Sequence, residues 1–142
     1  MTVTGVHLLK SRNGMTLLEL LAVVAIVAIL AAIAIPVYTG YMVRARRADA
    51  KTALEQLRAS QEMWRAERGR YANNGDDRNA LATLQNTCGA PANTVGYYTI
   101  SFVAVTRTSF SAQADSFGSQ ASDGDLFIDH RGTKTPADKW AK

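Results

Sequence analysis

The hydrophobic and polar positions of this chain follow two different patterns. From Leu20 to Val37 eighteen consecutive residues carry no polar group on their side chains. A helix of that length rises about 27 Å at roughly 1.5 Å per residue, close to the thickness of a bilayer core. The run therefore predicts a membrane-spanning helix. Glu19 stands at its start, where a carboxylate is costly in lipid and calls for a cationic partner.

Beyond this run the apolar positions become periodic and predict an amphipathic helix. They recur at steps of three, four and seven residues, at Val43, Ala50, Leu54, Leu57 and Trp64. Pro36 is the strongest helix breaker before Gly69, but helix formers resume directly after it. It therefore predicts a kink and not an end. We expect one helix from Met15 to Arg68.

The second half of the chain predicts a small antiparallel sheet. The expected elements are a loop over 69–95 with a helical turn at 80–84, strands over 97–105, 109–114 and 125–130, and a loop over 116–124. Alternation in the first strand turns one set of side chains inward, namely Tyr98, Ile100, Phe102 and Ala104. Arg131-Gly132 is a turn into a short fourth strand or tail, and Trp140 is expected to dock on the core. The fold class is α+β, with the long helix packed against the sheet.

Charge and composition narrow the function. The chain has 142 residues and a net charge of +4, which becomes +2 (4 − 2) without Lys10 and Arg12. The stretch from Arg44 to Arg70 carries eight basic and four acidic residues, a pattern compatible with DNA or anionic lipid. The favoured interpretation is a solvated or subunit-contacting helix face with local ion pairs, such as Arg58 with Glu62.

No constellation of catalytic or metal-binding residues is present in the sequence. His7 and His130 are far apart, and the spacing of Asp123, Asp125 and Asp129 does not fit an EF-hand loop. The single cysteine, Cys88, excludes a disulfide within the chain. We therefore expect no enzyme activity, no cofactor and no bound metal.

The N-terminal residues resemble the type IV pilins, and among them the type IVa class with short leaders. The resemblance rests on a basic leader ending in Gly14, on Met15, on Glu19 as the fifth residue after Gly14, and on the apolar helix containing Pro36. Further matches to the residue types common in these pilins are Tyr38, Tyr41 and Arg44. The later residues look like the globular half of minor pilins: Cys88-Gly89, the run 97–100, the run 125–129, Gly132 and Trp140.

This resemblance implies a processing and assembly pathway. A prepilin peptidase would cut after Gly14 on the cytoplasmic side and methylate the new amine of Met15. Glu19 would pair with that amine, in its own chain or in the next subunit, and Pro36 would loosen the helix during assembly. The implied division is a leader over 1–14, a membrane and filament-core segment over 15–40, and a globular domain over 41–142.

The resemblance also implies partners and location. The partners would be other pilins in a homo- or hetero-oligomer, the peptidase and methyltransferase, the inner-membrane assembly platform and membrane lipid. DNA is a less favoured partner, which only the basic stretch from Arg44 to Arg70 suggests. The chain would cross the inner membrane once with its N-terminus in the cytoplasm, and then enter an extracellular pilus for adhesion, twitching motility or DNA uptake. A bare count of Lys and Arg would invert this topology, because the far flank carries Arg44, Arg46, Arg47 and Lys51. The alternatives are a pseudopilin of a type II secretion system and a membrane-anchored binding module.

Three features of the chain depart from the pattern of the family. Many relatives pair two cysteines to hold the C-terminal loop, whereas Ser122-Asp123-Gly124 stands where a partner for Cys88 is expected. The loop must then be held by packing and hydrogen bonds, or Cys88 bonds between subunits. Met15 replaces the usual phenylalanine, and no glycine lies between Met15 and Thr39.

Overall fold

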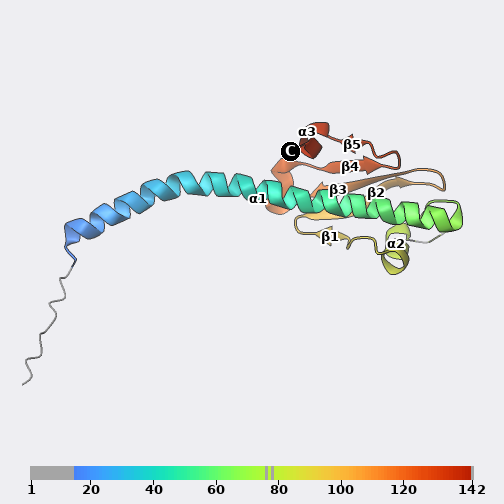
Figure 1. The fold of residues 1–142 in the computed structure, drawn as a ribbon, viewed down its shortest axis with the longest axis horizontal. Coiled ribbons are helices and arrows are strands. Elements are labelled where there is room, and N and C mark those ends of the chain that lie inside the picture. Colours follow the sequence, from blue (N-terminus) through green and yellow to red (C-terminus); the bar gives the residue numbers. More distant parts are fainter. Residues whose placement is uncertain (1–14, 76, 78, 142) are drawn as a thin grey trace, which may run out of the picture. The chain divides into compact units, whose positions relative to one another are not determined.

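A computed structural model describes residues 15–75, 77 and 79–141. Its longest element is α1, Leu17–Arg68, and this helix continues through Pro36 (Figure 1). The expectation of a single helix is confirmed, with a start at Leu17 instead of Met15. The chain divides into two compact units after Tyr38, and α1 contributes residues to both.

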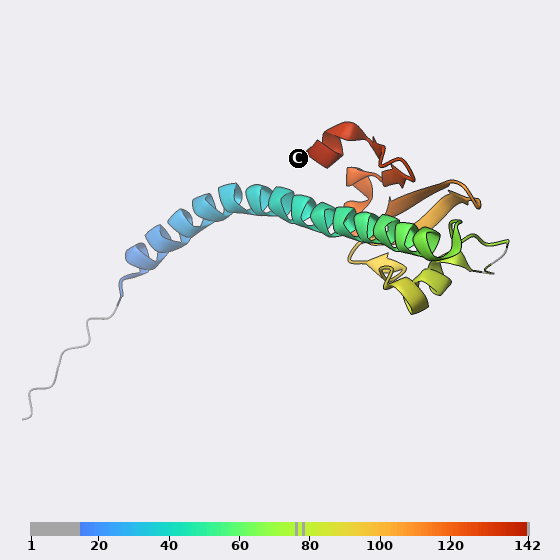
Figure 2. The same cartoon turned by 45° about the vertical axis from the view of Figure 1, so that its right-hand side comes forward.

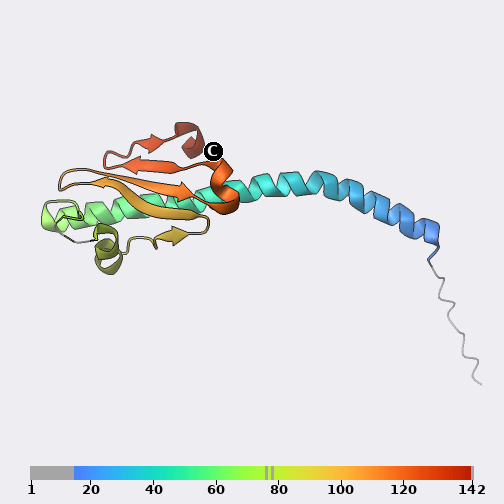
Figure 3. The same ribbon diagram turned by 180° about the vertical axis from the view of Figure 1, so that it is seen from behind.

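The second unit contains a five-stranded antiparallel sheet whose strands follow one another in sequence order. Figure 3 shows this order from behind, from β1 at one edge to β5 at the other. The strands are β1 (Thr94–Val95), β2 (Tyr98–Val105), β3 (Phe110–Ser116), β4 (Leu126–Asp129) and β5 (Lys134–Thr135). The three longer strands were expected, whereas the two-residue edge strand β1 was missed because so short a segment has no readable alternation.

The core lies between the sheet and the second half of α1. The helix contributes the predicted stripe, of which Ala50, Leu54, Leu57 and Trp64 are buried and Val43 is half-buried. The sheet contributes its inward face, which includes Tyr98, Ile100, Phe110, Ala112, Ala114, Leu126 and Ile128. The predicted packing of sheet on helix is confirmed.

Two short helices flank the sheet. Helix α2 (Ala80–Cys88) lies beside β1 and α3 (Ala137–Ala141) lies beside β5 (Figure 2). The expected single turn at 80–84 is in fact nine residues long, because Asn79 caps its start and Gly89, with φ of 66°, ends it. Trp140 on α3 packs partly buried against the core, as expected.

Two local predictions about the sheet were wrong. The alternation in β2 breaks at a register shift between Phe102 and Ala104, so Ala104 is exposed and Val105 packs against the core instead. The expected loop over 116–124 contains a 3₁₀ helix, η1 (Gly118–Asp123).

Candidate functional site

The start of α1 is capped by its own sequence. The hydroxyl of Thr16 accepts a hydrogen bond from the backbone N–H of Glu19 (3.2 Å), and the Thr16 carbonyl accepts one from Leu20 (3.1 Å). This is one half of a capping box, and it places the Glu19 carboxylate where the helix dipole favours negative charge. Within the described residues no ion pair involves Glu19. The predicted cut after Gly14 falls outside the described part of the chain.

The first unit of the structure exposes its apolar surface. From Leu17 to Tyr38 the large apolar side chains are between 50% and 82% exposed. Among the described helices α1 is long and apolar enough to cross a membrane. Apolar surface on all sides of a helix is covered in a stable state by lipid or by other protein. Met15 lies just before this helix and Pro36 within it, and their roles in processing and assembly remain predictions.

A second candidate site surrounds Tyr71, three residues after α1 ends. The buried Tyr71 hydroxyl donates to Glu62 (2.8 Å) and accepts from Arg65 (3.0 Å), and its backbone N–H donates to the Arg107 carbonyl (2.9 Å). Its ring centroid lies 6.3 Å from that of His130. The end of α1, the β2–β3 turn and the β4–β5 turn therefore meet here. We call this surface the Tyr71 end; it comprises Arg65, Arg68, Arg70, Tyr71, Arg107, His130 and Arg131.

Buried hydrogen bonds make the Tyr71 end rigid. The Gln61 amide donates to the Ala72 carbonyl (3.0 Å) and accepts from the Ala72 N–H (2.9 Å), which fastens the loop after α1 to the helix. Burial, followed by the hydrogen bond to Glu62, raises the pKa of Tyr71. The hydroxyl therefore stays protonated at neutral pH and keeps its place between Glu62 and Arg65.

Several carboxylates at the Tyr71 end are engaged within the protein. Asp77 holds Arg70 through two hydrogen bonds (2.7 and 3.0 Å), and Asp129 accepts from the backbone N–H groups of Arg131 (2.9 Å) and Thr133 (2.8 Å). The guanidinium of Arg68 stacks on Trp64, 4.0 Å from the ring centroid. Arg68 and Arg131 form no ion pair with any described residue, and so two positive charges remain available to an anionic partner.

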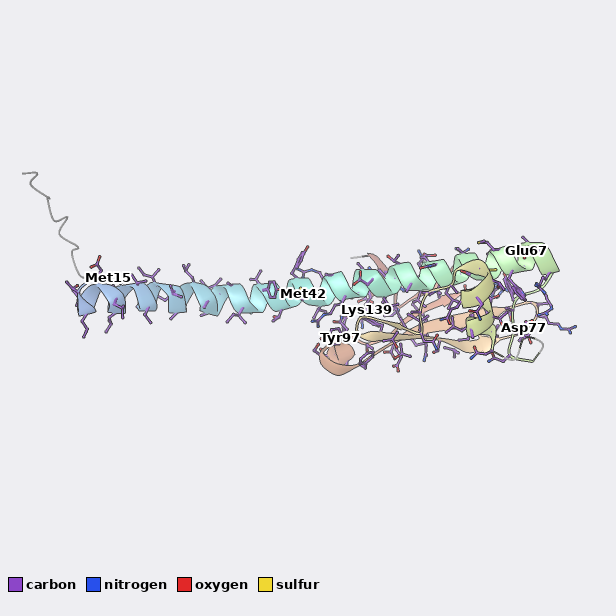
Figure 4. All side chains as sticks on the ribbon, turned by 90° about the horizontal axis from the view of Figure 1, so that it is seen from below. Met15, Met42, Glu67, Asp77, Tyr97 and Lys139 are labelled. Atoms are coloured by element: carbon purple, nitrogen blue, oxygen red, sulfur yellow. The ribbon has the colours of Figure 1, made fainter. Side chains whose placement is uncertain are left out.

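The opposite end of the globular unit is held by a buried cluster around Asp123. Figure 4 places Tyr97 and Lys139 at that end and Glu67 and Asp77 at the other. The Asp123 carboxylate accepts from the Arg47 guanidinium (Nε 2.8 Å) and from the Tyr98 hydroxyl (2.9 Å). The Gln120 amide donates to Asp123 (3.1 Å) and to the Val43 carbonyl (3.1 Å). These bonds fasten η1 to α1, which is the task that sequence analysis left to packing and hydrogen bonds.

The Asp123 cluster shifts the ionisation of its members. Burial alone would raise the pKa of Asp123, but the hydrogen bonds from Arg47 and Tyr98 outweigh it and hold that pKa below its ordinary value. Burial, together with the bond to Asp123, raises the pKa of Tyr98 to about 12. The cluster is therefore a carboxylate, a guanidinium and a neutral phenol at neutral pH.

Helix α1 carries the local ion pairs that its charge pattern predicts, but with other partners. Arg58 lies 3.9 Å from Glu55 and not beside Glu62, which pairs with Arg65 at 3.9 Å. The predicted Arg58–Glu62 pair was wrong because the i,i+3 neighbours are closer here than the i,i+4 ones. Lys134 on β5 also contacts Glu55 (2.5 Å). Along this face the two carboxylates Glu55 and Glu62 thus lie close to three cations.

Cys88 ends α2 and is half-buried. Its carbonyl accepts from the hydroxyl of Ser60 (3.1 Å), and it is a free thiol. In the described residues no group of His, Cys, Asp and Glu side chains is arranged to hold a metal ion.

Comparison with known families decides the identity of the chain. Residues 36–126 match the model of the type IV minor pilin ComP, DNA uptake sequence receptor, and residues 9–35 match the prokaryotic N-terminal methylation motif. The chain belongs to the type IV minor pilin ComP family. This family is one of structural pilins and not of enzymes. A search of curated proteins finds no match.

The candidate functional residues of this minor pilin differ in how far the sequence alone reveals them. The methylation motif covers Gly14, Met15 and Glu19, all of which the sequence singled out. The Tyr71 end was missed because it joins Arg65 and Arg131, which lie on different elements. The Asp123 cluster was also missed, because Arg47, Tyr98 and Asp123 lie on three different elements.

Proposed function

We propose that this minor pilin is cut after Gly14, methylated at Met15 and polymerised through its apolar helix into an extracellular pilus, where its globular domain binds DNA for uptake. The proposal rests on two family matches that adjoin in the sequence, the methylation motif over 9–35 and the ComP model over 36–126. Together they cover residues 9–126 of the 142-residue chain, and both describe the same kind of protein. They favour a pilus over a secretion pseudopilus.

Assembly is supported by the chemistry of the N-terminal segment. A cut after Gly14 gives Met15 a cationic amine, and the Glu19 carboxylate one turn into the helix has the opposite sign. In lipid an unpaired carboxylate is costly, so pairing with an amine of a neighbouring subunit favours docking over free diffusion. The exposed apolar side chains from Leu17 to Tyr38 would then form the filament core.

The proposed division and location follow from this pathway. Residues 1–14 form the leader, 15–40 the membrane and filament-core segment, and 41–142 the globular domain. Before assembly the chain sits in the inner membrane with its N-terminus in the cytoplasm, in contact with the peptidase and the assembly platform. After assembly its neighbours are other pilins.

We propose the Tyr71 end as the DNA-binding surface. Its arginines come from three segments held together by buried contacts, while Asp77 and Asp129 point their oxygens at protein donors. Arg68 and Arg131 are the cations best placed to reach phosphates, because no ion pair within the described residues engages them. Phosphate contacts of this kind supply affinity without regard to sequence.

Processing is tested by mass spectrometry. Co-expression with a prepilin peptidase should give an intact mass for a chain that starts at N-methyl-Met15. If the chain keeps the mass of the uncut form, which starts at Met1, under conditions where a known prepilin is cut, the proposed processing is refuted.

DNA binding is tested with the full-length chain in detergent micelles and a labelled duplex. Replacing Arg68 and Arg131 by alanine should lower the slope of log affinity against log salt by about 1.8, or roughly 0.9 per phosphate contact. Arg44→Ala is the matched control, since Arg44 is exposed and lies before residue 47, near the other end of the globular unit. An equal effect of the control and the double variant would place the DNA elsewhere.

A further inference from the structure

A hollow lined by asparagines lies beside the Tyr71 end. Its volume is about 280 Å³, and it is formed by the start of α2, the segment before β1 and the middle of β2. Asn74, Asn79 and Asn93 are exposed at its rim, and Leu81 and Ile100 are buried at its floor. The backbone N–H of Ile100 donates to the Asn93 carbonyl (2.7 Å), which holds the rim against β2.

The amide oxygens of two rim residues are already occupied. Asn74 Oδ1 accepts the backbone N–H of Ala80 (2.9 Å), and Asn79 Oδ1 accepts that of Ala82 (3.0 Å) as the cap of α2. Because a backbone N–H can only donate, these bonds fix which atom of each amide is the oxygen. The NH₂ group of each side chain is therefore left to donate elsewhere, and no described residue accepts from it.

The hydrogen bonds of Gln85 fix the orientation of the Asn93 amide in the same way. The Gln85 Nε2 donates to the Pro91 carbonyl (2.7 Å) and to Asn93 Oδ1 (2.6 Å). The Pro91 carbonyl can only accept, so the Gln85 atom is nitrogen and the Asn93 atom is oxygen. Asn93 is thus the third rim side chain whose amide donor is unused by the described residues.

The donors, the apolar floor and the lack of charge together select a class of ligand. Among the described lining residues none is charged, so a phosphate there would lose its hydration without a compensating cation. A floor that includes Leu81 and Ile100 suits an uncharged base edge better than a phosphate. The guanine edge in the major groove offers two acceptors, N7 and O6, whereas adenine and cytosine present an amino donor there. Asparagines whose oxygens each already accept a hydrogen bond and whose NH₂ groups are unused by the described residues therefore favour guanine, and next the O4 acceptor of thymine.

We infer that this asparagine hollow reads acceptor-rich base edges, guanine first, in DNA held by the Tyr71 end. The inference rests on the proposed DNA-binding function and adds a base preference to it. Asn74 follows Tyr71 by three residues, so their Cα atoms are at most about 11 Å apart at 3.8 Å per residue. That span is about three base pairs at 3.4 Å each, so one duplex reaches both surfaces.

Four variants separate the amide donors from the structural role of the asparagines. Asn79→Ser keeps a neutral capping oxygen and removes the amide. Asn74→Asp and Asn93→Asp keep the accepting oxygen but replace the donor by a second carboxylate oxygen. Asn86→Asp adds the same charge to an exposed position of α2 that does not line the hollow, and it is the matched control.

The experiment selects duplexes from a random pool with the full-length chain in detergent micelles and sequences the bound fraction. The wild-type chain should enrich guanine at one or more positions by about 5- to 150-fold, the discrimination typical of a good base-edge contact. Asn79→Ser should lose that enrichment while its affinity for the unselected pool stays within about twofold, since phosphate contacts are untouched. Asn74→Asp and Asn93→Asp should lose it as well, and Asn86→Asp should retain it.

A second readout uses a modified base. Placing 7-deazaguanine, which lacks the N7 acceptor, at the enriched position should weaken binding by the wild-type chain and leave Asn79→Ser unchanged. Wild-type binding without base preference, or a preference kept by all three hollow variants, overturns the inference but leaves DNA binding intact. A wild-type chain that binds no duplex overturns the proposed DNA function and the inference together.

Discussion

The leucines in the two halves of α1 differ sharply in solvent exposure. Before Tyr38, Leu18 and Leu30 are 79% and 61% exposed, whereas beyond it Leu54 and Leu57 are fully buried. The side chains have the same chemistry, but only the second pair meets a sheet from its own chain. The globular unit thus buries its apolar side chains within its own chain. The apolar side chains of the N-terminal segment need lipid or neighbouring subunits to cover them. Folding and assembly depend on different residues and can be broken separately.

The largest effect is expected from Glu19→Ala, which acts on assembly alone. The variant should still be cut and methylated, but its incorporation into pili should fall roughly tenfold or more, because nothing then favours docking beside a cationic amine. The measurement is the ratio of filament-bound to membrane-bound chain by immunoblot. Glu19→Asp, which keeps the carboxylate, serves as the control. Normal filling of pili by Glu19→Ala would refute the proposed amine pairing.

Leucine truncation on either side of Tyr38 tests the comparison directly. Leu57→Ala removes a fully buried side chain and should lower the free energy of unfolding by about 2 to 5 kcal/mol. Leu30→Ala makes the same change on an exposed surface and should alter it by less than about 0.5 kcal/mol. Thermal or denaturant unfolding in micelles, followed by the fluorescence of Trp64 and Trp140, measures both. Similar losses from the two variants would mean that the N-terminal segment also supports the globular core.

Removing the buried carboxylate of Asp123 should have a smaller effect. Asp123→Asn leaves Arg47 partly buried without its counter-ion and should cost about 1 to 3 kcal/mol. The pKa of Asp123 is lower in the folded chain, so its stabilisation is present above the ordinary range of an aspartate and is lost as the pH falls through the folded value. Unfolding measured from pH 6 down to pH 2 should therefore show a steeper loss of stability in the wild type than in Asp123→Asn. Parallel curves would show that the pair contributes nothing to stability.

The smallest effect is expected at Cys88. Cys88→Ser changes a half-buried free thiol and should shift the free energy of unfolding by less than about 0.5 kcal/mol. A reducing agent should likewise leave the melting temperature of the wild type unchanged. A reducible dimer of the wild-type chain, absent in Cys88→Ser, would instead support a bond between subunits.

Local pattern was sufficient for a large part of the fold. The spacing of Leu54, Leu57 and Trp64 predicted the buried face of α1, and the alternation of the first predicted strand placed Tyr98 and Ile100 inward, where both are buried. Helix α2 was underestimated although Asn79 and Gly89 are strong start and stop signals. The register shift in β2 depends on pairing with β3, so no single-strand pattern shows it.

The candidate sites also differ in how far apart their residues lie in the sequence. Glu19 was found because its meaning depends on residues within one helical turn of it. The Arg47–Asp123 contact joins positions 76 residues apart, and the Tyr71 end joins α1 to two distant turns. Such contacts depend on how the sheet folds back on the helix, which local periodicity does not specify.

The bond between Arg47 and Asp123 also bears on where and when this subunit matures. Closing a loop with a disulfide requires an oxidant and a thiol exchange enzyme. Closing it with an ion pair and hydrogen bonds, as here, requires only that the sheet has formed. The contact between η1 and α1 therefore forms without a redox step, and it weakens in acid, to which a disulfide in the same place would be insensitive.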